Sequence, residues 1–241
     1  MISVRTKLYF SMENLILQQF FVFTFPERHD KMCSYLYFSF LRGQTMDSNF
    51  FALISRMRYI ARWGLMRNAL PENIQEHSHM MAVLAHALGV IRRDIFHQPC
   101  DVNALATAAL YHDASEILTG DLPTPIKYHN AEIMSAYHAV EDLAVQKLLG
   151  MLPPELRETY ADVLAEDKDG DIYPLVKAAD KLSAYIKCIE ERKAGNNEFL
   201  SAEAQTRAAL EASPLPEVQY FLEHFIPAFE RDLDELGAIG Q

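Results

Sequence analysis

The chain has few of the features that mark secreted or membrane-spanning proteins. Its three cysteines, Cys33, Cys100 and Cys188, lie far apart and without CxxC spacing, so neither a disulfide framework nor a thiolate zinc site is expected. No apolar run approaches the roughly 20 residues that a bilayer-spanning helix needs. The beginning of the chain also lacks the basic, apolar and cleavage regions of a secretory signal. We therefore expect a cytoplasmic protein that does not bind a membrane.

Positive charge is scarce as well. The 22 Lys and Arg residues are outnumbered by 33 Asp and Glu residues, which gives a formal net charge of −11. A general nucleic-acid-binding surface needs a basic stripe that displaces counterions from phosphates, so no polymeric nucleic-acid partner is expected. A small anionic substrate remains compatible with this composition if positive charge is concentrated in a metal site.

The first part of the chain differs from the rest. Half of the 241 residues are hydrophobic, which is ample for a packed core, but residues 1–45 hold seven of the 14 Phe with little helical periodicity. Met46 then begins a regular amphipathic pattern. We expect one domain over residues 46–241, preceded by an atypical N-terminal extension over 1–45. This extension could reflect a misplaced start codon, or it could be a hydrophobic segment that covers a surface or contacts a partner or membrane.

The domain is expected to be all-α. From Met46 onward apolar residues recur at three- and four-residue intervals, while strand-like alternation is scarce. The sequence Gly-Asp-Leu-Pro-Thr-Pro over Gly120–Pro125 predicts a break and an ordered loop, because Gly and two prolines end a helix. Arg62 and Trp63 are expected to close the first helix. The predicted helices cover residues 48–60, 76–93, 102–118, 130–150, 154–165, 173–194, 197–211 and 216–236.

Four residues on three of these helices form a candidate metal site. His77 and His112 each fall on the apolar, core-facing side of a predicted helix, and Asp113 can approach the same point from beside His112. Asp180 lies in a strongly apolar helix, where an unpaired charge would be costly. Two imidazoles and two carboxylates suit Mn²⁺, Co²⁺, Fe²⁺ or Zn²⁺. Four ligands also leave room for water and a substrate oxygen, as metal-assisted hydrolysis requires.

The order of these residues carries a family resemblance. His77, then His112-Asp113, then Asp180 on successive helices resembles the HD-domain metal-dependent phosphohydrolase superfamily. Five further blocks narrow the resemblance to the bacterial 5′-deoxynucleotidases, from about residue 46 to about residue 236. These blocks are Arg62–Arg67 (RWGLMR), Glu72–Ser78 (ENIQEHS), Tyr111–Glu116 (YHDASE), Gly120–Lys127 (GDLPTPIK) and Ala194–Phe199 (AGNNEF).

The resemblance implies a fold, a reaction and an assembly. The fold would be an HD-domain helical bundle with a metal site between its core helices. The reaction would be hydrolysis of deoxyribonucleoside 5′-monophosphates to deoxyribonucleosides and phosphate, with one divalent cation such as Co²⁺ or Mn²⁺ as cofactor. The partner would be the small deoxynucleotide substrate, and the protein would be a homodimer.

Two carboxylates are candidate catalytic residues. Glu116 follows His112 by one helical turn, so it can orient the attacking water or take its proton, although an exposed glutamate at a helix end is the alternative. Asp121 begins the proline-restricted loop. The resemblance implies that it binds the sugar or protonates the leaving 5′ oxygen, whereas a loop cap is the alternative. Further substrate contacts implied by the resemblance are Arg62, Trp63, Asp113, Asp121, Leu122, Pro123 and Thr124.

Two other functions fit part of this pattern. Another HD hydrolase, acting on a nucleoside triphosphate, a cyclic nucleotide or a signalling nucleotide, would share the metal ligands but not the substrate-facing blocks. A nucleotide-binding regulatory module without turnover is expected to lack a metal ligand or the acid at Glu116, and none is missing here.

Overall fold

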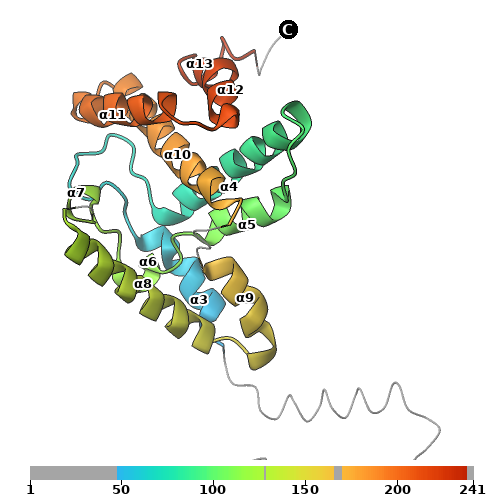
Figure 1. The fold of residues 1–241 in the computed structure, drawn as a ribbon. Helices are drawn as coiled ribbons and strands as arrows, with labels where there is room; N and C mark the ends of the chain where they lie inside the picture. The colour runs from blue at the N-terminus through green and yellow to red at the C-terminus, as the bar shows by residue number, and fades with distance from the viewer. Residues whose placement is uncertain (1–47, 128, 166–169, 238–241) are drawn as a thin grey trace, which may run out of the picture. The chain divides into compact units, whose positions relative to one another are not determined.

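The described part of the protein is a helical domain. The structure is a computed structural model that describes residues 48–127, 129–165 and 170–237, so the predicted extension over 1–45 lies outside the described residues. Within these ranges there is no β-strand, only one antiparallel bridge between Ala61 and Asn73. The expected all-α fold is thus confirmed (Figure 1). The helices searched in these ranges include none with the length and apolar character to cross a bilayer.

The helices occur close to the predicted ranges. Their bounds are α3 Phe50–Ile54, 3₁₀ helix η1 Ser55–Tyr59, α4 Ile74–Val90, π-helix η2 Ile91–Ile95, α5 Val102–Tyr111, α6 Glu116–Thr119, α7 Thr124–Lys127, α8 Ala131–Gly150, 3₁₀ helix η3 Pro154–Leu156, α9 Arg157–Leu164, α10 Tyr173–Lys193, 3₁₀ helix η4 Asn197–Phe199, α11 Leu200–Glu211, α12 Pro216–His224 and α13 Ile226–Phe229.

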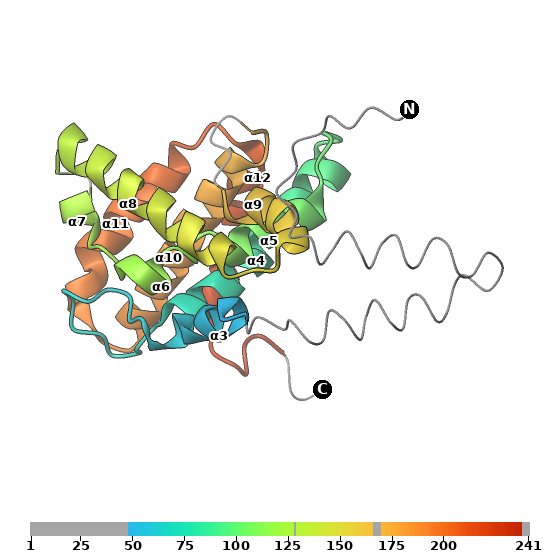
Figure 2. The same cartoon turned by 90° about the horizontal axis from the view of Figure 1, so that it is seen from below.

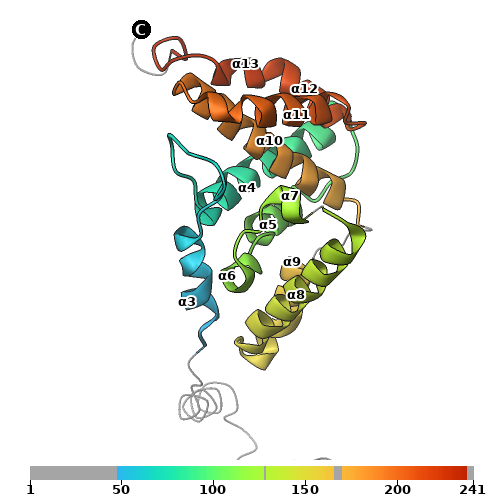
Figure 3. The same ribbon diagram turned by 90° about the vertical axis from the view of Figure 1, so that its left-hand side faces the viewer.

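The main hydrophobic core lies where α4, α5 and α10 pack together. Helices α11 and α13 pack against α10, and α12 packs against α11, α13, α4 and η2 (Figures 1 and 3). Gly89 allows α4 to approach α5 closely, because a Cβ atom there would lie 3.1 Å from the side chain of Leu105. The buried apolar residues of this core include Met81, Leu84, Leu88, Leu105, Ala109, Leu175, Leu182, Ile189, Leu210 and Phe221.

A second hydrophobic cluster joins α3, α8 and α9. It contains Phe50, Ala114, Leu148 and Leu164, and the short helix α6 lies between α8 and the α3–η1 segment (Figure 2). Ala109, just before the predicted metal pair, belongs to the main core, whereas Ala114, just after it, belongs to the second cluster. The predicted metal pair therefore lies at the junction of the two clusters.

Three local predictions were wrong. The predicted helix over 102–118 is broken after Tyr111, because the backbone hydrogen bonds switch to the tighter i+3 pattern, as in Ala114 N–H to Tyr111 O at 2.9 Å. The predicted helix over 216–236 ends at His224 and is followed by the separate α13. Arg62 and Trp63 do not close the first helix, since η1 ends at Tyr59 and Ile60 is already extended.

Candidate metal centre and the polar site around it

His77 is presented by the first turn of α4. Asn73 and Glu76 form a capping box that starts the helix, because each side chain pairs with the backbone N–H of the other residue. The imidazole of His77 is completely buried, and its Nδ1 lies 3.1 Å from Oγ of Ser183 on α10. This contact orients the ring so that Nε2 is the nitrogen available for a ligand.

His112 stands at the C-terminal end of α5. Its Nδ1 lies 2.9 Å from the carbonyl oxygen of Ala109, which can only accept, so Nδ1 carries a proton and Nε2 is the nitrogen that can bind a metal. The ring centroids of His77 and His112 are 5.4 Å apart. One ligand atom each from His77, His112 and Asp180 lie within 4.8 Å of one another, a group that could hold a metal ion.

Two carboxylates face the Nε2 atoms. Oδ1 of Asp180 lies 3.3 Å from Nε2 of His77, and Oδ1 of Asp113 lies 3.0 Å from Nε2 of His112. The other oxygen of Asp113, Oδ2, lies 3.7 Å from Nε2 of His77. The structure thus brings all four predicted metal ligands together, from α4, the turn after α5, and α10. Asp113 stands beside the compact group of three.

The ionisation of the two aspartates reflects this cluster. Burial by itself raises the pKa of a carboxyl group, but the neighbouring His112, His77 and Arg62 outweigh it and hold the pKa of Asp113 well below its usual range. Burial is likewise outweighed at Asp180, where the neighbouring His77, His112 and Arg62 lower the pKa of the carboxyl group. Both aspartates are therefore ionised at neutral pH, as metal ligands must be.

Glu116 is the first residue of α6 and is buried, so the alternative of an exposed glutamate at a helix end was wrong. Its Oε2 is buried and has no hydrogen-bond partner among the described residues. Burial, followed by the negative charges of Asp113 and Asp121, raises the pKa of Glu116 to about 10. A carboxyl group in these surroundings becomes ionised at neutral pH only when positive charge comes close.

Arg62 supplies positive charge next to Asp113. Its Nη1 donates to Oδ2 of Asp113 at 3.4 Å, and its Nε lies 3.2 Å from Oε2 of Glu72. Burial opposes the charged form, but Asp113, Asp180 and Glu72 outweigh it and raise the pKa of the guanidinium. The guanidinium therefore stays charged beside the predicted ligands.

The loop after α6 returns the chain toward this cluster. Gly120 has φ 73°, a conformation that favours glycine, and Asp121 follows it. Burial raises the pKa of Asp121, and the charges of Arg62, Asp113 and His77 act on it, so its carboxylate belongs to the same electrostatic group. Leu122 and Pro123 are half-buried and lead into α7, a short helix that the sequence pattern did not predict.

The loop continues into α7, whose last residue is anchored on α8. Thr124 is the first residue of α7, and its side chain lies outside the described residues. Lys127 closes α7 and donates to Oε1 of Glu141 at 3.0 Å, while its Nζ stands 4.5 Å from the ring centroid of Tyr137. These contacts tie the loop that carries Asp121 to α8.

No role at the site was predicted from the sequence for two further residues. Ser183 follows Asp180 by three residues and so shares its helix face, a spacing that could have indicated a partner for a ligand. Glu72 begins the Glu72–Ser78 block that carries the family resemblance, but neither the resemblance nor the residue pattern gave it a role of its own. Its role depends on Arg62 and Trp63, which only the folded chain brings against it.

Comparisons with known proteins identify the family of the chain. The profile of a family described as 5′-deoxynucleotidase YfbR-like matches residues 49–229. The chain is 50% identical over 192 residues to 5′-deoxynucleotidase YfbR of Shigella boydii, which covers 79% of this chain and 96% of the relative. The protein of the same name from Escherichia coli K12 has the same identity and coverage. A crystal structure of an HD-domain phosphohydrolase from Listeria innocua is 25% identical, covers 75% of this chain and 88% of its own, and has a TM-score of 0.67.

Proposed function

The chain belongs to the 5′-deoxynucleotidase YfbR-like family, and on that premise we propose that His77, His112, Asp113 and Asp180 hold one divalent cation. At this centre the protein hydrolyses deoxyribonucleoside 5′-monophosphates to deoxyribonucleosides and phosphate. The observation that carries the proposal is that the Nε2 atoms of both histidines face the ionised carboxylates of Asp113 and Asp180 at 3.0 to 3.7 Å.

The residues fit a divalent cation in three respects. Nε2 of His77 is buried without a hydrogen-bond partner in the described part of the chain, as expected of an atom reserved for a ligand. Both imidazoles have their Nδ1 occupied, by Ser183 and by the carbonyl of Ala109. The mixed nitrogen and oxygen donors suit Mn²⁺, Co²⁺, Fe²⁺ or Zn²⁺. Such a cation supplies Lewis acidity, which activates water and polarises a phosphoryl group.

Glu116 is proposed as the residue that orients the attacking water and takes its proton. Its unpaired, buried Oε2 is an acceptor with no other use among the described residues. Because burial and the acids Asp113 and Asp121 raise its pKa to about 10, Glu116 needs positive charge nearby to act as a base at neutral pH. The charge of Arg62 already opposes this rise without cancelling it, so the remaining positive charge would come from the proposed cation.

Arg62 and Asp121 are proposed to act on the two ends of the bond that breaks. The planar donor groups of Arg62 suit a phosphate, and its contact with Asp113 puts them beside the proposed cation ligands. Asp121, whose pKa is raised by burial, is suited to donate a proton to the leaving 5′ oxygen or a hydrogen bond to the sugar. Trp63 is proposed to contact the sugar, and Leu122, Pro123 and Thr124 are proposed to contact the deoxynucleoside.

A substrate panel tests this function. Deoxynucleoside and ribonucleoside 5′-monophosphates, nucleoside triphosphates and cyclic nucleotides are offered with Mn²⁺, Co²⁺, Zn²⁺ or Mg²⁺ in parallel, and phosphate release is measured. We expect release from deoxynucleoside monophosphates ahead of their ribonucleotide counterparts. Turnover restricted to triphosphates or cyclic nucleotides would indicate another HD hydrolase. Nucleotide binding without turnover under any of the four metals would indicate a regulatory module.

The assembly and the cellular location are part of the same proposal. A homodimer is implied by the family resemblance, and its molecular mass in solution is measured by light scattering coupled to size exclusion. A cytoplasmic location is tested by cell fractionation. A monomer in solution at micromolar concentration would contradict the expected homodimer. Recovery in the membrane fraction would contradict the expected cytoplasmic location.

A further inference from the structure

One carboxylate joins the two residues that give the Arg-Trp block its identity. Oε2 of Glu72 accepts a hydrogen bond from Nε1 of Trp63 at 2.9 Å and lies 3.2 Å from Nε of Arg62. Nη1 of Arg62 in turn donates to Asp113 at 3.4 Å. The guanidinium is therefore held between Glu72 and the predicted metal ligand Asp113. Oε2 of Glu72 also holds the indole.

The backbone fixes Glu72 opposite these two residues. The N–H of Arg62 donates to the carbonyl of Glu72 at 3.0 Å, and the N–H of Ile74 donates to the carbonyl of Ile60 at 3.0 Å. Together with the bridge between Ala61 and Asn73, these bonds close the base of a loop over residues 62–72. Glu72 thus lies opposite Arg62 at the base of this loop, independently of the conformation of the rest of the loop.

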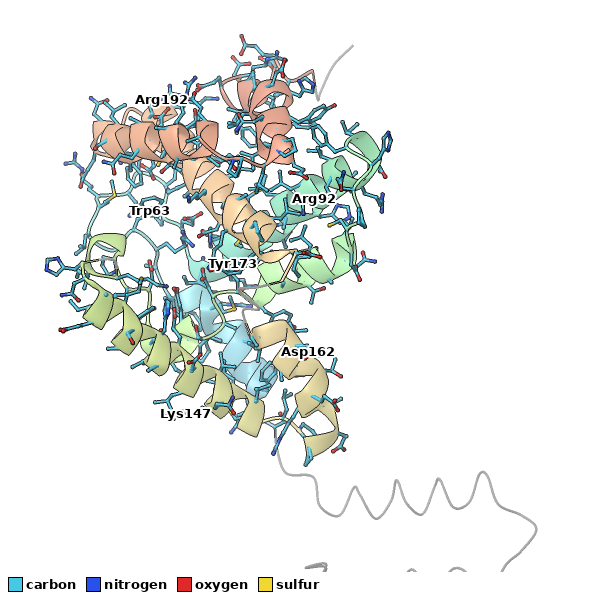
Figure 4. The ribbon with its side chains drawn as sticks, viewed as in Figure 1. Trp63, Arg92, Lys147, Asp162, Tyr173 and Arg192 are labelled. Atoms are coloured by element: carbon cyan, nitrogen blue, oxygen red, sulfur yellow. The ribbon has the colours of Figure 1, made fainter. Side chains whose placement is uncertain are left out.

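Trp63 needs such support because its backbone is strained. Its φ of 58° lies in the left-handed region, which is unfavourable for a residue other than glycine. The indole packs edge-on against Phe199, with ring centroids 5.2 Å apart, and Figure 4 labels Trp63 in the loop beside α10 and α11. The ring contact holds the indole against η4, while the Nε1 hydrogen bond to Glu72 sets its rotation.

Hydrogen bonds and charge, more than packing, hold the Glu72 side chain. It lines a pocket of about 180 Å³ between the loop, α4 and α10. A shortened side chain at this position therefore leaves an existing pocket larger and does not open a sealed void in the core. The far half of the loop has its own anchor, since the N–H groups of Ala69 and Leu70 donate to Glu191. Loss of the Glu72 carboxylate should thus release Arg62 and Trp63 without releasing the loop.

We propose that Glu72 is a positioning residue that sets the preference for deoxyribose over ribose, by fixing the rotation of the Trp63 indole and the direction of the Arg62 guanidinium. Glu72 itself does not touch the substrate. The inference rests on the proposed function, in which Trp63 contacts the sugar and Arg62 the phosphate. The two contacts make different contributions, because the indole acts on sugar selectivity and the guanidinium on phosphate binding.

Two variants separate these contributions. Glu72→Ala removes both contacts, and we expect the ratio of kcat/KM for 2′-deoxyadenosine to adenosine 5′-monophosphate to fall about tenfold, the effect of losing a hydrogen bond to a charged group. Glu72→Gln keeps an oxygen that can accept from the indole but loses the charge that faces Arg62. It should keep most of the sugar selectivity and raise KM for both nucleotides. Arg67→Ala, in the same loop with a side chain 85% exposed, is the matched control and should leave the ratio unchanged.

Fluorescence gives a readout that a purely structural role would not move. Trp63 is the only tryptophan in the chain, so the emission spectrum reports on this one indole. In Glu72→Ala we expect emission shifted to longer wavelength and stronger quenching by acrylamide, with helical circular dichroism unchanged. In Glu72→Gln the emission should stay close to that of the parent chain.

A double-mutant cycle tests whether Glu72 acts through Trp63. Trp63→Phe keeps an aromatic ring but has no N–H to donate, so adding Glu72→Gln or Glu72→Ala to it should not lower the sugar selectivity further. Equal losses of kcat/KM for both sugars in Glu72→Ala, with unchanged emission, would overturn the inference. So would full additivity with Trp63→Phe. A parent chain without any preference for deoxynucleotides would contradict the proposed function itself, whereas a parent preference that survives Glu72→Ala contradicts only the role of Glu72.

Discussion

Nδ1 of His77 on α4 lies 3.1 Å from the hydroxyl oxygen of Ser183 on α10, one helical turn beyond Asp180. A single face of α10 therefore supplies both a predicted metal ligand and the group that orients a second one. This relationship couples the proposed metal site to the packing of α4 against α10.

Replacement of Ser183 by alanine should weaken metal binding while the fold is retained. The hydroxyl fixes the ring orientation of His77, and removal of such a supporting group typically lowers metal affinity by about 10- to 100-fold. Metal affinity is measured by competition with a chromogenic chelator. Ser78→Ala is the matched control, because Ser78 is also buried on α4 but its hydroxyl has no partner in the described part of the chain. Equal affinities of Ser183→Ala and the parent would contradict the orienting role.

Asp180→Asn should purify with much less metal than the parent chain. The substitution keeps the size of the side chain but removes the charge that faces His77 at 3.3 Å. Metal content is determined by elemental analysis after dialysis. Asp162→Asn, on the exposed surface of α9, makes the same chemical change away from the cluster and should retain the metal (Figure 4). Unchanged metal content in Asp180→Asn would remove Asp180 from the ligand set.

Glu116→Gln should bind metal and nucleotide but turn over slowly. The amide cannot accept the proton of the attacking water, and loss of a general base typically costs about 10²- to 10⁴-fold in rate. The rate is measured by phosphate release at saturating substrate, and binding by calorimetry with a nonhydrolysable analogue. Glu132→Gln, on the exposed first turn of α8, serves as the control. A fully active Glu116→Gln enzyme would mean that another group activates the water.

Glu191→Gln should lower the stability of the domain in a pH-dependent way. Glu191 is completely buried, forms a close ion pair with Lys187 and accepts from the N–H groups of Ala69 and Leu70 at 2.8 and 2.9 Å. Removing one charge of a buried pair typically costs about 3–5 kcal/mol. Urea unfolding at pH 7, followed by circular dichroism, measures the loss.

The sign of the pH dependence follows from the pKa of Glu191. Burial alone would raise it, but hydrogen bonds from Lys187, Asn196 and the loop backbone outweigh burial and lower the pKa from 4.5 to about 2. Because the pKa of Glu191 is lower in the folded than in the unfolded chain, its carboxylate stabilises the folded state at pH values above the unfolded-state pKa. This stabilisation is lost as the pH falls from about 4.5 toward 2. The difference between parent and Glu191→Gln should therefore narrow over this window. Glu190→Gln should show no such narrowing, because burial raises the pKa of Glu190.

Much of the fold could be predicted because its helices carry strong local signals. The apolar periodicity gave α8 and α10 to within one residue at each end, and the Gly120 break was found at the right place. The failures share a cause. The end of α5 at Tyr111 and the short α7 depend on how the chain packs around the polar site, and local apolar spacing carries no information about that packing.

The same division applies to the site. Residue type and helix face were enough to predict the metal-binding residues His77, His112, Asp113 and Asp180. The atoms that face one another could be found only in the folded chain: Nε2 of both histidines, the unpaired oxygen of Glu116, and the Glu72 carboxylate between Arg62 and Trp63. This difference arises because side-chain periodicity within a helix is local. The approach of α4, the α5 turn, α10 and the loop over 62–72 is set by long-range packing, which no short segment encodes.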